Sequence, residues 1–354
     1  MRRVRRLVVG GGAALALLAG VGACDRGGER ASVGPEKREL RVAVVFDIGG
    51  KDDNGFNRGA ADGARRAAAE GGIALRLVDT DPDASREAVI EELARTSDLV
   101  VGIGFLLSDP LTRAAAKHPE VRFASMDYVI PVDARGRAIL PPNNLAAVVF
   151  REEEGAYLVG AAAGLATRSR VVGFVGGMSS PMIRRFEAGY EAGVRRTCGG
   201  CRMVSGYAGT TPAAFNDPAK GYALAAAHYA AGADVVFHAA GATGDGVFRA
   251  AREGGAGTAR RLVVGVDVDQ QALAPGRTLT SMLKRMDVAV HDVMRRAREG
   301  RLEGGLQAYG LAEQGVGYVR DTRNAAWIDD AMARRLDVLR AGIVAGLIVV
   351  PTSR

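Results

Sequence analysis

The sequence predicts an α/β protein built from two successive doubly wound lobes, each with a parallel sheet. The chain has 354 residues, enough for two globular units of common size. From residue 40 onward, short β-branched runs alternate with helical stretches. Repeated βα units of this kind specify a parallel sheet that is covered on both faces. Polar and aromatic residues collect just after the expected strands, where such sheets bind ligands.

The first series of βα units ends near residue 150. Its expected strands are 41–46, 74–78, 98–103, 122–126 and 146–150. Its expected helices are 57–70, 85–95 and 110–117. A turn-rich segment, 131–144, precedes the last of these strands.

A second series follows a long, largely apolar helix expected at 152–166. Its expected strands are 171–175, 202–207, 235–239 and 262–266. Its expected helices are 182–195, 218–231, 246–253 and 270–273. The apolar run 343–351 predicts a final strand packed on a lobe, without a role in ligand binding.

The composition excludes two classes of protein. Hydrophobic residues make up 48% and charged residues 25% of the chain, which is too apolar for a disordered protein. The formal net charge is +7, but four of the positive charges are arginines at positions 2–6, and losing them would leave +3. A nucleic-acid-binding protein usually shows a focused basic stripe, so we expect no nucleic-acid partner.

The N-terminus has the order of an export signal. The arginines at positions 2–6 precede an uncharged apolar run, 7–23, that is too short and glycine-rich for a membrane span. Small residues then stand directly before Cys24, a pattern that resembles a bacterial lipobox. We therefore expect a signal peptide over 1–23, a lipidated Cys24 and a flexible tether over 24–39. The alternative is an ordinary secretory signal that is cleaved nearby.

Cys198 and Cys201 are the other cysteines of the chain. A zinc site needs four ligands, and there is no second cysteine pair. A thioredoxin-like pair stands where a helix begins, whereas this pair follows a helical pattern. In an exported protein the pattern predicts a small structural disulfide that fixes a turn.

Candidate ligand residues follow several expected strands. The set consists of carboxylates, loop aromatics, an amide and a lysine: Asp47, Phe56, Asn57, Asp127, Phe215, Asp245, Asp267 and Lys284. Two facing aromatic rings can stack on a planar heterocycle, and carboxylates accept hydrogen bonds from base N–H groups or ribose hydroxyls. The same carboxylates would repel a phosphate, so a nucleoside suits the set better than a nucleotide. The alternative for Phe56 is a hydrophobic staple at the start of its helix.

Ordered motifs over residues 40–351 carry a family resemblance. They lie at 47–57, 150–155, 172–177 with Pro181 and Phe186, 215–221, 241–246, 265–270 and 279–284. With these motifs the chain resembles the basic membrane lipoprotein family, which includes purine nucleoside receptors of ABC transporters. The resemblance implies a type I periplasmic-binding-protein fold with a hinge and an interlobe cleft. It implies one lobe from 40–149 plus about 285–312, and the other from 150–284 plus about 313–354.

The resemblance also implies a role for each candidate. Phe56 and Phe215 would stack on the base, and Asp127 would accept from the base edge. Asp267 and Lys284 would hold the ribose hydroxyls, although Lys284 could instead pair with Asp267. The remaining candidates would make further polar contacts: Asp47, Asn57 and Asp245.

The chain departs from the family pattern at three places. Gly55 stands where the family often has serine, the loop before Phe215 is longer, and the pair Cys198 and Cys201 is not a family feature. These departures leave the fold intact and bear on the identity of the ligand.

The function implied is that of a substrate-binding lipoprotein of an ABC importer, anchored to the outer face of the cell membrane. We expect a monomer that binds a nucleoside, with purines favoured, and delivers it to a membrane permease. The alternatives keep the fold but bind riboflavin or another ribityl or ribosyl heterocycle, or act as a ligand sensor.

We expect no cofactor, no metal and no enzymatic activity. The histidines are scattered and form no H-E-x-x-H pair, and no G-x-S-x-G elbow occurs. Asp52-Asp53 and Asp267-x-Asp269 could hold a hard cation, but the loop at 47–57 lacks EF-hand spacing. His238 lies in a strand run and is expected to be a core or cleft residue.

Overall fold

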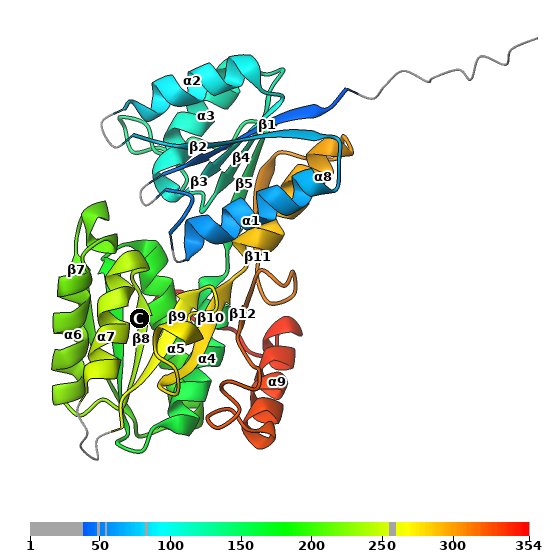
Figure 1. Cartoon of the computed structure of the whole chain (residues 1–354). Helices are drawn as coiled ribbons and strands as arrows, with labels where there is room; N and C mark the ends of the chain where they lie inside the picture. The colour runs from blue at the N-terminus through cyan, green and yellow to red at the C-terminus, as the bar shows by residue number, and fades with distance from the viewer. Residues whose placement is uncertain (1–37, 48–49, 54, 82–83, 255–259, 354) are drawn as a thin grey trace, which may run out of the picture. The chain divides into compact units, whose positions relative to one another are not determined.

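The computed structural model describes residues 38–353 apart from 48–49, 54, 82–83 and 255–259. The expected signal peptide, Cys24 and most of the expected tether lie outside the described residues. The described elements form two six-stranded sheets (Figure 1) within one compact unit, Arg38–Arg354.

The first sheet has the order β11-β5-β4-β3-β1-β2, and all its strand pairs are parallel. Its strands are β1 (Leu40–Phe46), β2 (Ile73–Asp79), β3 (Leu99–Ile103), β4 (Arg122–Met126), β5 (Leu145–Phe150) and β11 (Gly305–Tyr309). Its helices are α1 (Phe56–Ala69), α2 (Arg86–Thr96), α3 (Ser108–Lys117) and α8 (Met286–Arg298). Helix α1 packs against α8, and α2 against α3. The central strands are buried on both faces, which explains their continuous apolar runs.

The second sheet has the order β12-β10-β9-β8-β6-β7. Its strands are β6 (Val171–Met178), β7 (Arg202–Gly209), β8 (Val235–Ala239), β9 (Leu262–Asp267), β10 (Thr278–Lys284) and β12 (Val316–Tyr318). Its helices are α4 (Glu152–Ala166), α5 (Pro181–Thr197), α6 (Pro218–Ala230), α7 (Gly244–Glu253) and α9 (Asp330–Val344). Short 3₁₀ turns lie at η1 (Phe105–Leu107), η2 (Pro212–Phe215), η3 (Gly241–Thr243) and η4 (Gln271–Leu273). Strand β12 is antiparallel to β10, and the other pairs are parallel.

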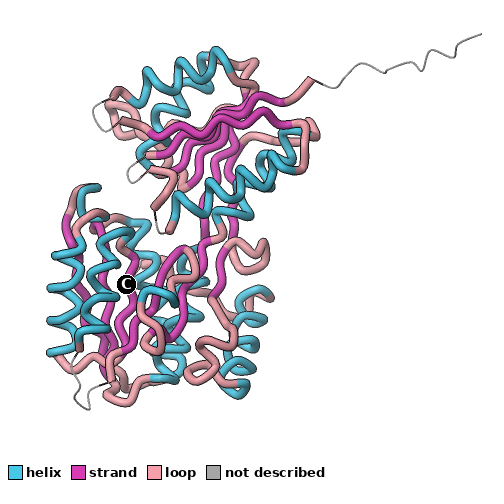
Figure 2. The backbone as a smooth tube through the Cα atoms, in the orientation of Figure 1, coloured by secondary structure: helices cyan, strands magenta, loops and turns pink. Residues whose placement is uncertain are grey.

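The backbone passes between the two sheets after β5, β10 and β11, as the trace in Figure 2 follows. Hydrogen bonds tie these crossings together. Arg151 N–H donates to the Tyr309 carbonyl at 3.1 Å, and Arg285 N–H donates to the Gly315 carbonyl at 2.8 Å. The Glu154 carboxylate accepts from Leu311 N–H at 2.7 Å. Helix α4 starts at the crossing after β5, and through Glu154 it also binds the backbone of the crossing after β11.

The alternation of strands and helices predicted from the sequence is confirmed, with bounds that agree to within three residues. The exception is the helix expected at 270–273, which is the 3₁₀ turn η4. Strand β11 and helix α8 join the first sheet, whereas β12 joins the second. The lobe boundaries themselves stay a prediction. Cys198 and Cys201 are joined in the structure by a disulfide with a Cα–Cα distance of 5.4 Å.

The predicted final strand at 343–351 is wrong. Helix α9 continues to Val344, and Gly346 follows with a φ of +72°, a conformation that ends a helix. Leu347 and Val349 are 84% and 87% exposed, so this apolar run does not enter a sheet. Within the part of the chain that the structure describes, no helix has the length and apolar character needed to cross a membrane.

Candidate functional site

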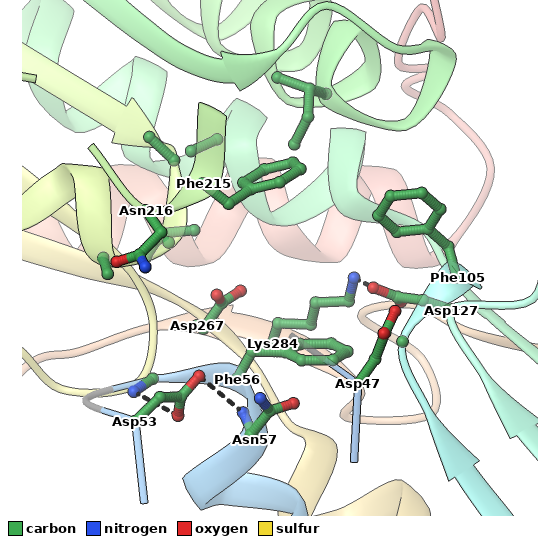
Figure 3. Close-up of a pocket in the computed structure, with 18 of the residues that line it drawn as sticks. Asp47, Asp53, Phe56, Asn57, Phe105, Asp127, Phe215, Asn216, Asp267 and Lys284 are labelled. Carbon is green, nitrogen blue, oxygen red and sulfur yellow. Dashed lines mark hydrogen bonds and ion pairs between the residues drawn. The ribbon is translucent and has the colours of Figure 1, made fainter. Parts of the chain in front are cut away.

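A cavity of about 370 Å³ lies at the carboxyl ends of strands from both sheets (Figure 3). The ends of β1, β3 and β4 contribute from the first sheet, and those of β8, β9 and β10 contribute from the second. All candidate ligand residues line it: Asp47, Phe56, Asn57, Asp127, Phe215, Asp245, Asp267 and Lys284. Residues far apart in the sequence thus meet in one place, as expected at the strand ends of open α/β sheets.

Phe56 and Phe215 lie on opposite sides of the open space in Figure 3. Phe56 is the first residue of α1, on the side of the first sheet, and Phe215 ends η2, on the side of the second. Phe105 meets the Phe215 ring edge-on, with the ring centroids 6.5 Å apart. A flat ligand between Phe56 and Phe215 would therefore contact one residue from the side of the first sheet and one from the side of the second.

The position of Phe215 is fixed by the residues around it. Buried Thr243 donates to the Ala214 carbonyl at 2.8 Å and accepts from Asp217 N–H at 2.7 Å, so it fastens the backbone on either side of the ring. Gly177 leaves the room that the ring occupies, because a Cβ there would lie 2.5 Å from Phe215 Cδ1. The ring is therefore held in place without a bound ligand.

Asp53 organises the start of α1 beside Phe56. Its carboxylate accepts from the backbone N–H groups of Gly55, Asn57 and Arg58 at 3.0, 3.2 and 2.9 Å. This carboxylate occupies the positive N-terminal end of the helix, where a phosphate would otherwise bind. Asp53 also lines the cavity.

Lys284, at the end of β10 in the second sheet, is a buried cation that contacts Asp127, which follows β4 in the first sheet. Its Nζ lies 2.5 Å from Asp127 Oδ1 and 3.1 Å from Glu152 Oε1. It also lies 5.3 Å from the centroid of the Phe56 ring. Burial alone would lower the pKa of Lys284, but Asp127 and Glu152 outweigh it and raise that pKa, so the lysine is charged. The alternative partner expected from the sequence, Asp267, makes no ion pair with Lys284 among the described residues.

Asp127 and Asp267 share an unusual backbone conformation. Their φ values are 61° and 66°, in the left-handed region that few residues other than glycine adopt. Asp127 directly follows β4, and Asp267 ends β9. Such strained residues gather at ligand sites, where the surrounding structure holds them in place.

The Asp267 carboxylate has no hydrogen-bond or ion-pair partner among the described residues. Burial raises the pKa of Asp267 to about 7; Lys284 opposes this rise, and the charges of Asp127 and Asp53 add to it. Gly55 leaves space beside it, since a Cβ there would lie 3.9 Å from Asp267 Oδ2. Asp267 is thus free to accept hydrogen bonds from a ligand.

The other candidates are more constrained. Asp47 is paired with Arg86, whose NH2 lies 2.9 Å from Asp47 Oδ1. Asn57 is buried in the first turn of α1. Asp245 stands in the first turn of α7, where burial raises its pKa. Each of the three still borders the cavity.

Several residues of the site were not among the candidates taken from the sequence. Asp53, Phe105, Asn216 and Gln270 line the cavity, and Glu152 is the second partner of Lys284. Phe105 lies two residues after the end of β3, so the strand-end signal could have found it. Glu152 belongs to the motif at 150–155, but nothing in that motif shows that it meets Lys284. The described residues hold no cluster of three or more His, Cys, Asp or Glu side chains suited to a metal ion.

Two α/β sheets linked by several crossings, with a cavity at their strand ends, define a substrate-binding protein of the periplasmic-binding type. A solute-binding protein of an ABC transporter system from Aeropyrum pernix has the same fold, with a TM-score of 0.75 at 32% identity over 88% of this chain and 94% of that one. A periplasmic ribose ABC transporter structure from Conexibacter woesei, at 14% identity and a TM-score of 0.60, shares the fold alone.

The sequence comparisons give the family. Residues 40–353 match the family of PnrA-like ABC transporter substrate-binding proteins. The nucleoside-binding protein BmpA of an ABC transporter from Lactococcus lactis is 32% identical over 96% of each chain. Basic membrane protein A of Borreliella burgdorferi is 31% identical over 89% of this chain and 88% of its own length. The chain belongs to this family, and it is a substrate-binding protein of an ABC transporter.

Proposed function

We propose that the protein binds nucleosides, preferentially purine nucleosides, outside the cytoplasm and delivers them to a membrane permease without chemical conversion. The single observation that carries the proposal is the Asp267 carboxylate, which has no hydrogen-bond or ion-pair partner among the described residues and lines a cavity with Phe56 and Phe215 on its opposite sides. A carboxylate can accept hydrogen bonds from the two adjacent hydroxyls of a ribose, while the rings stack on the base. The relative from Lactococcus lactis is named for binding nucleosides, which agrees with this reading.

The cavity favours a nucleoside over two other ligands. A phosphate would meet the carboxylates of Asp53, Asp127 and Asp267, and Asp53 already occupies the N-terminus of α1. At about 370 Å³ the cavity is at the small end of ligand sites, which favours a two-ring base over the three rings of a flavin. Asp127, which is paired with Lys284, would accept from the base edge.

We propose further that the two lobes close on the ligand. Phe56 and Phe215 come from the two sides of the cavity, so an approach of these sides would bring both rings onto a bound base. Attachment to the outer face of the membrane through a lipidated Cys24 would keep the monomeric protein near its permease. No step in this cycle makes or breaks a covalent bond.

The test is calorimetric titration of the mature protein, unfolded and refolded to remove any retained ligand. The titrants are purine nucleosides, pyrimidine nucleosides, riboflavin, free bases and ribose. Saturable binding of a nucleoside, with none of ribose, supports the proposal. Binding of riboflavin alone, or of ribose alone, would overturn the nucleoside assignment and leave the fold unchanged.

A further inference from the structure

Gln270 lines the cavity next to the proposed ribose site. It follows Asp267 by three residues and is 6% exposed, so its side chain is almost entirely enclosed. Its backbone N–H donates to Ser281 Oγ at 3.1 Å, which fastens the residue to β10. Polar groups that are this well buried almost always have hydrogen-bond partners, so we ask which atoms the Gln270 amide contacts.

The orientation of the Gln270 amide follows from its partners. The Val266 backbone N–H donates to Oε1 at 2.9 Å, and because a backbone N–H can only donate, that atom must be the carbonyl oxygen. The His238 Nε2 lies 3.2 Å from the same oxygen. Since the oxygen only accepts, His238 must carry its proton on Nε2.

His238 is built to keep that proton in place. It is fully buried, and its ring lies edge-on to Phe248 with centroids 5.4 Å apart. Gly244 leaves room for the ring, because a Cβ there would lie 2.1 Å from His238 Cε1. Burial lowers the pKa of His238 to about 4, so the imidazole is neutral near neutral pH.

Oε1 of Gln270 contacts both the Val266 N–H and His238 Nε2, so the amide nitrogen Nε2 is the part of the side chain that remains to be accounted for. It has no hydrogen-bond partner among the described residues, and Gln270 borders the cavity. The aspartates around the cavity can only accept when ionised, and the Lys284 ammonium already serves Asp127 and Glu152. The Gln270 amide is therefore an oriented donor at the cavity, three residues along the chain from the Asp267 carboxylate.

We propose that Gln270 determines ligand specificity by donating its amide N–H to an acceptor atom on the nucleoside near the sugar, and that His238 is its positioning residue. The inference rests on the proposed nucleoside function and deepens it. The acceptor is a ring nitrogen of the purine on its sugar side or the 5′ oxygen. A ligand that presents an N–H or C–H group at that point is selected against, because the enclosed amide is then left unpaired.

The test compares variants across a series of analogues. Gln270→Glu keeps the carbonyl-type oxygen that accepts from Val266 and His238, but its carboxylate cannot donate. The probes are adenosine, 3-deazaadenosine, 7-deazaadenosine and 5′-deoxyadenosine, titrated calorimetrically. We expect the wild type to bind either 3-deazaadenosine or 5′-deoxyadenosine about five- to tenfold more weakly than adenosine, as for one lost hydrogen bond. The control is 7-deazaadenosine, because its missing nitrogen lies on the edge of the base away from the sugar. Gln270→Glu should bind adenosine more weakly and lose the discrimination against that same analogue.

His238→Phe serves as the second variant, because it keeps a ring in the space beside Phe248 and removes the donor. It should stay folded and reduce discrimination against the same analogue, since the Gln270 amide can then rotate. Unchanged discrimination in Gln270→Glu would overturn the inference while nucleoside binding stands. A wild-type protein that binds adenosine and all three analogues equally would also overturn it, and one that binds no nucleoside overturns the proposed function with it.

Discussion

At the scale of single residues, Asp127 and Asp267 both have a left-handed backbone where they line the cavity. Each such conformation costs about 1–3 kcal/mol and persists where its surroundings enforce it. Asp127 is held by its ion pair with Lys284. Asp267 has no such partner among the described residues. A ligand that donates hydrogen bonds to its carboxylate would stabilise the ionised form and lower its raised pKa.

Asp267 predicts a pH dependence. Its folded-state pKa of about 7 lies above the ordinary value of 3.8, so the folded protein binds this proton more tightly than the unfolded chain. The contribution of Asp267 to the free energy of unfolding is therefore greatest at low pH and is lost as pH rises through about 7. Ribose hydroxyls donate to the ionised form, so we expect nucleoside affinity to rise over the same range.

Asp267→Asn is the matched variant for this pH effect. Urea unfolding of the ligand-free protein at about pH 5 and about pH 8 should show a smaller pH dependence in the variant. Its nucleoside affinity should fall by about 1.5–3 kcal/mol, as for hydrogen bonds to a charged group, while a free base is affected much less. Equal losses for adenosine and adenine would contradict the ribose assignment.

Gly177 predicts that binding can be impaired without substituting a residue that lines the cavity. In Gly177→Ala the new methyl would lie 2.5 Å from Phe215 Cδ1, so the ring must leave its present position. Loss of one stacking contact should weaken nucleoside binding by about 1–3 kcal/mol in calorimetry. Gly317→Ala is the control, because a Cβ there has no atom within 4 Å among the described residues. Wild-type affinity in Gly177→Ala would argue against stacking on Phe215.

The sequence was sufficient to predict which residues gather at the cavity, because parallel strands place their carboxyl ends on one edge. It was not sufficient to predict how those residues pair. Lys284 meets Glu152, which is 132 positions away, and only the crossings between the sheets bring them together. Phe105 carries the same strand-end signal as the predicted residues and was nonetheless missed.

At the scale of elements, helices α4 and α5 approach closely through glycines. A Cβ on Gly160 would lie 2.1 Å from the Tyr190 carbonyl oxygen, and one on Gly193 would lie 2.0 Å from the Tyr157 carbonyl oxygen. Helix α4 also carries Glu152 and Glu154, which contact Lys284 and the third crossing. The packing of α4 against α5 therefore fixes where Glu152 meets Lys284 at the site.

Gly160→Ala should lower the free energy of unfolding by about 1–3 kcal/mol, because the methyl meets backbone that cannot move aside. Helix propensity alone would give the opposite sign, since alanine is favoured over glycine by about 1 kcal/mol within a helix. Gly59→Ala in α1 is the control, with its Cβ at an ordinary 3.6 Å from Met286 Cβ. Thermal unfolding of the two variants should move in opposite directions, and a stable Gly160→Ala would contradict the close packing.

Most elements could be predicted because their local patterns agree with the fold. The buried strands are continuous apolar runs bounded by turn residues, and Ser85, Ser180 and Asp217 cap the helices that follow them. The run at 343–351 failed because an apolar pattern does not show whether a partner strand is available. In the structure α9 extends into this run, and Gly346 ends the regular structure.

At the scale of the whole molecule, the two sheets meet at the cavity and along the crossings. The ion pair of Lys284 with Asp127 joins the end of β10 in the second sheet to the end of β4 in the first. The two stacking candidates also come from the two sides. Ligand binding and the approach of the lobes should therefore be one cooperative event.

This cooperativity predicts that the effects of Phe56→Ala and Phe215→Ala are not additive. Each single variant should weaken nucleoside binding by about 1–3 kcal/mol, as for a lost stacking contact. Once one ring is gone, the lobes gain less from closing, so the second substitution should cost less than it does alone, with a coupling of about 0.5–3 kcal/mol. Calorimetry on the wild type, both single variants and the double variant gives the coupling directly. Additive losses would mean that the two rings act independently and would contradict the coupling of stacking to closure.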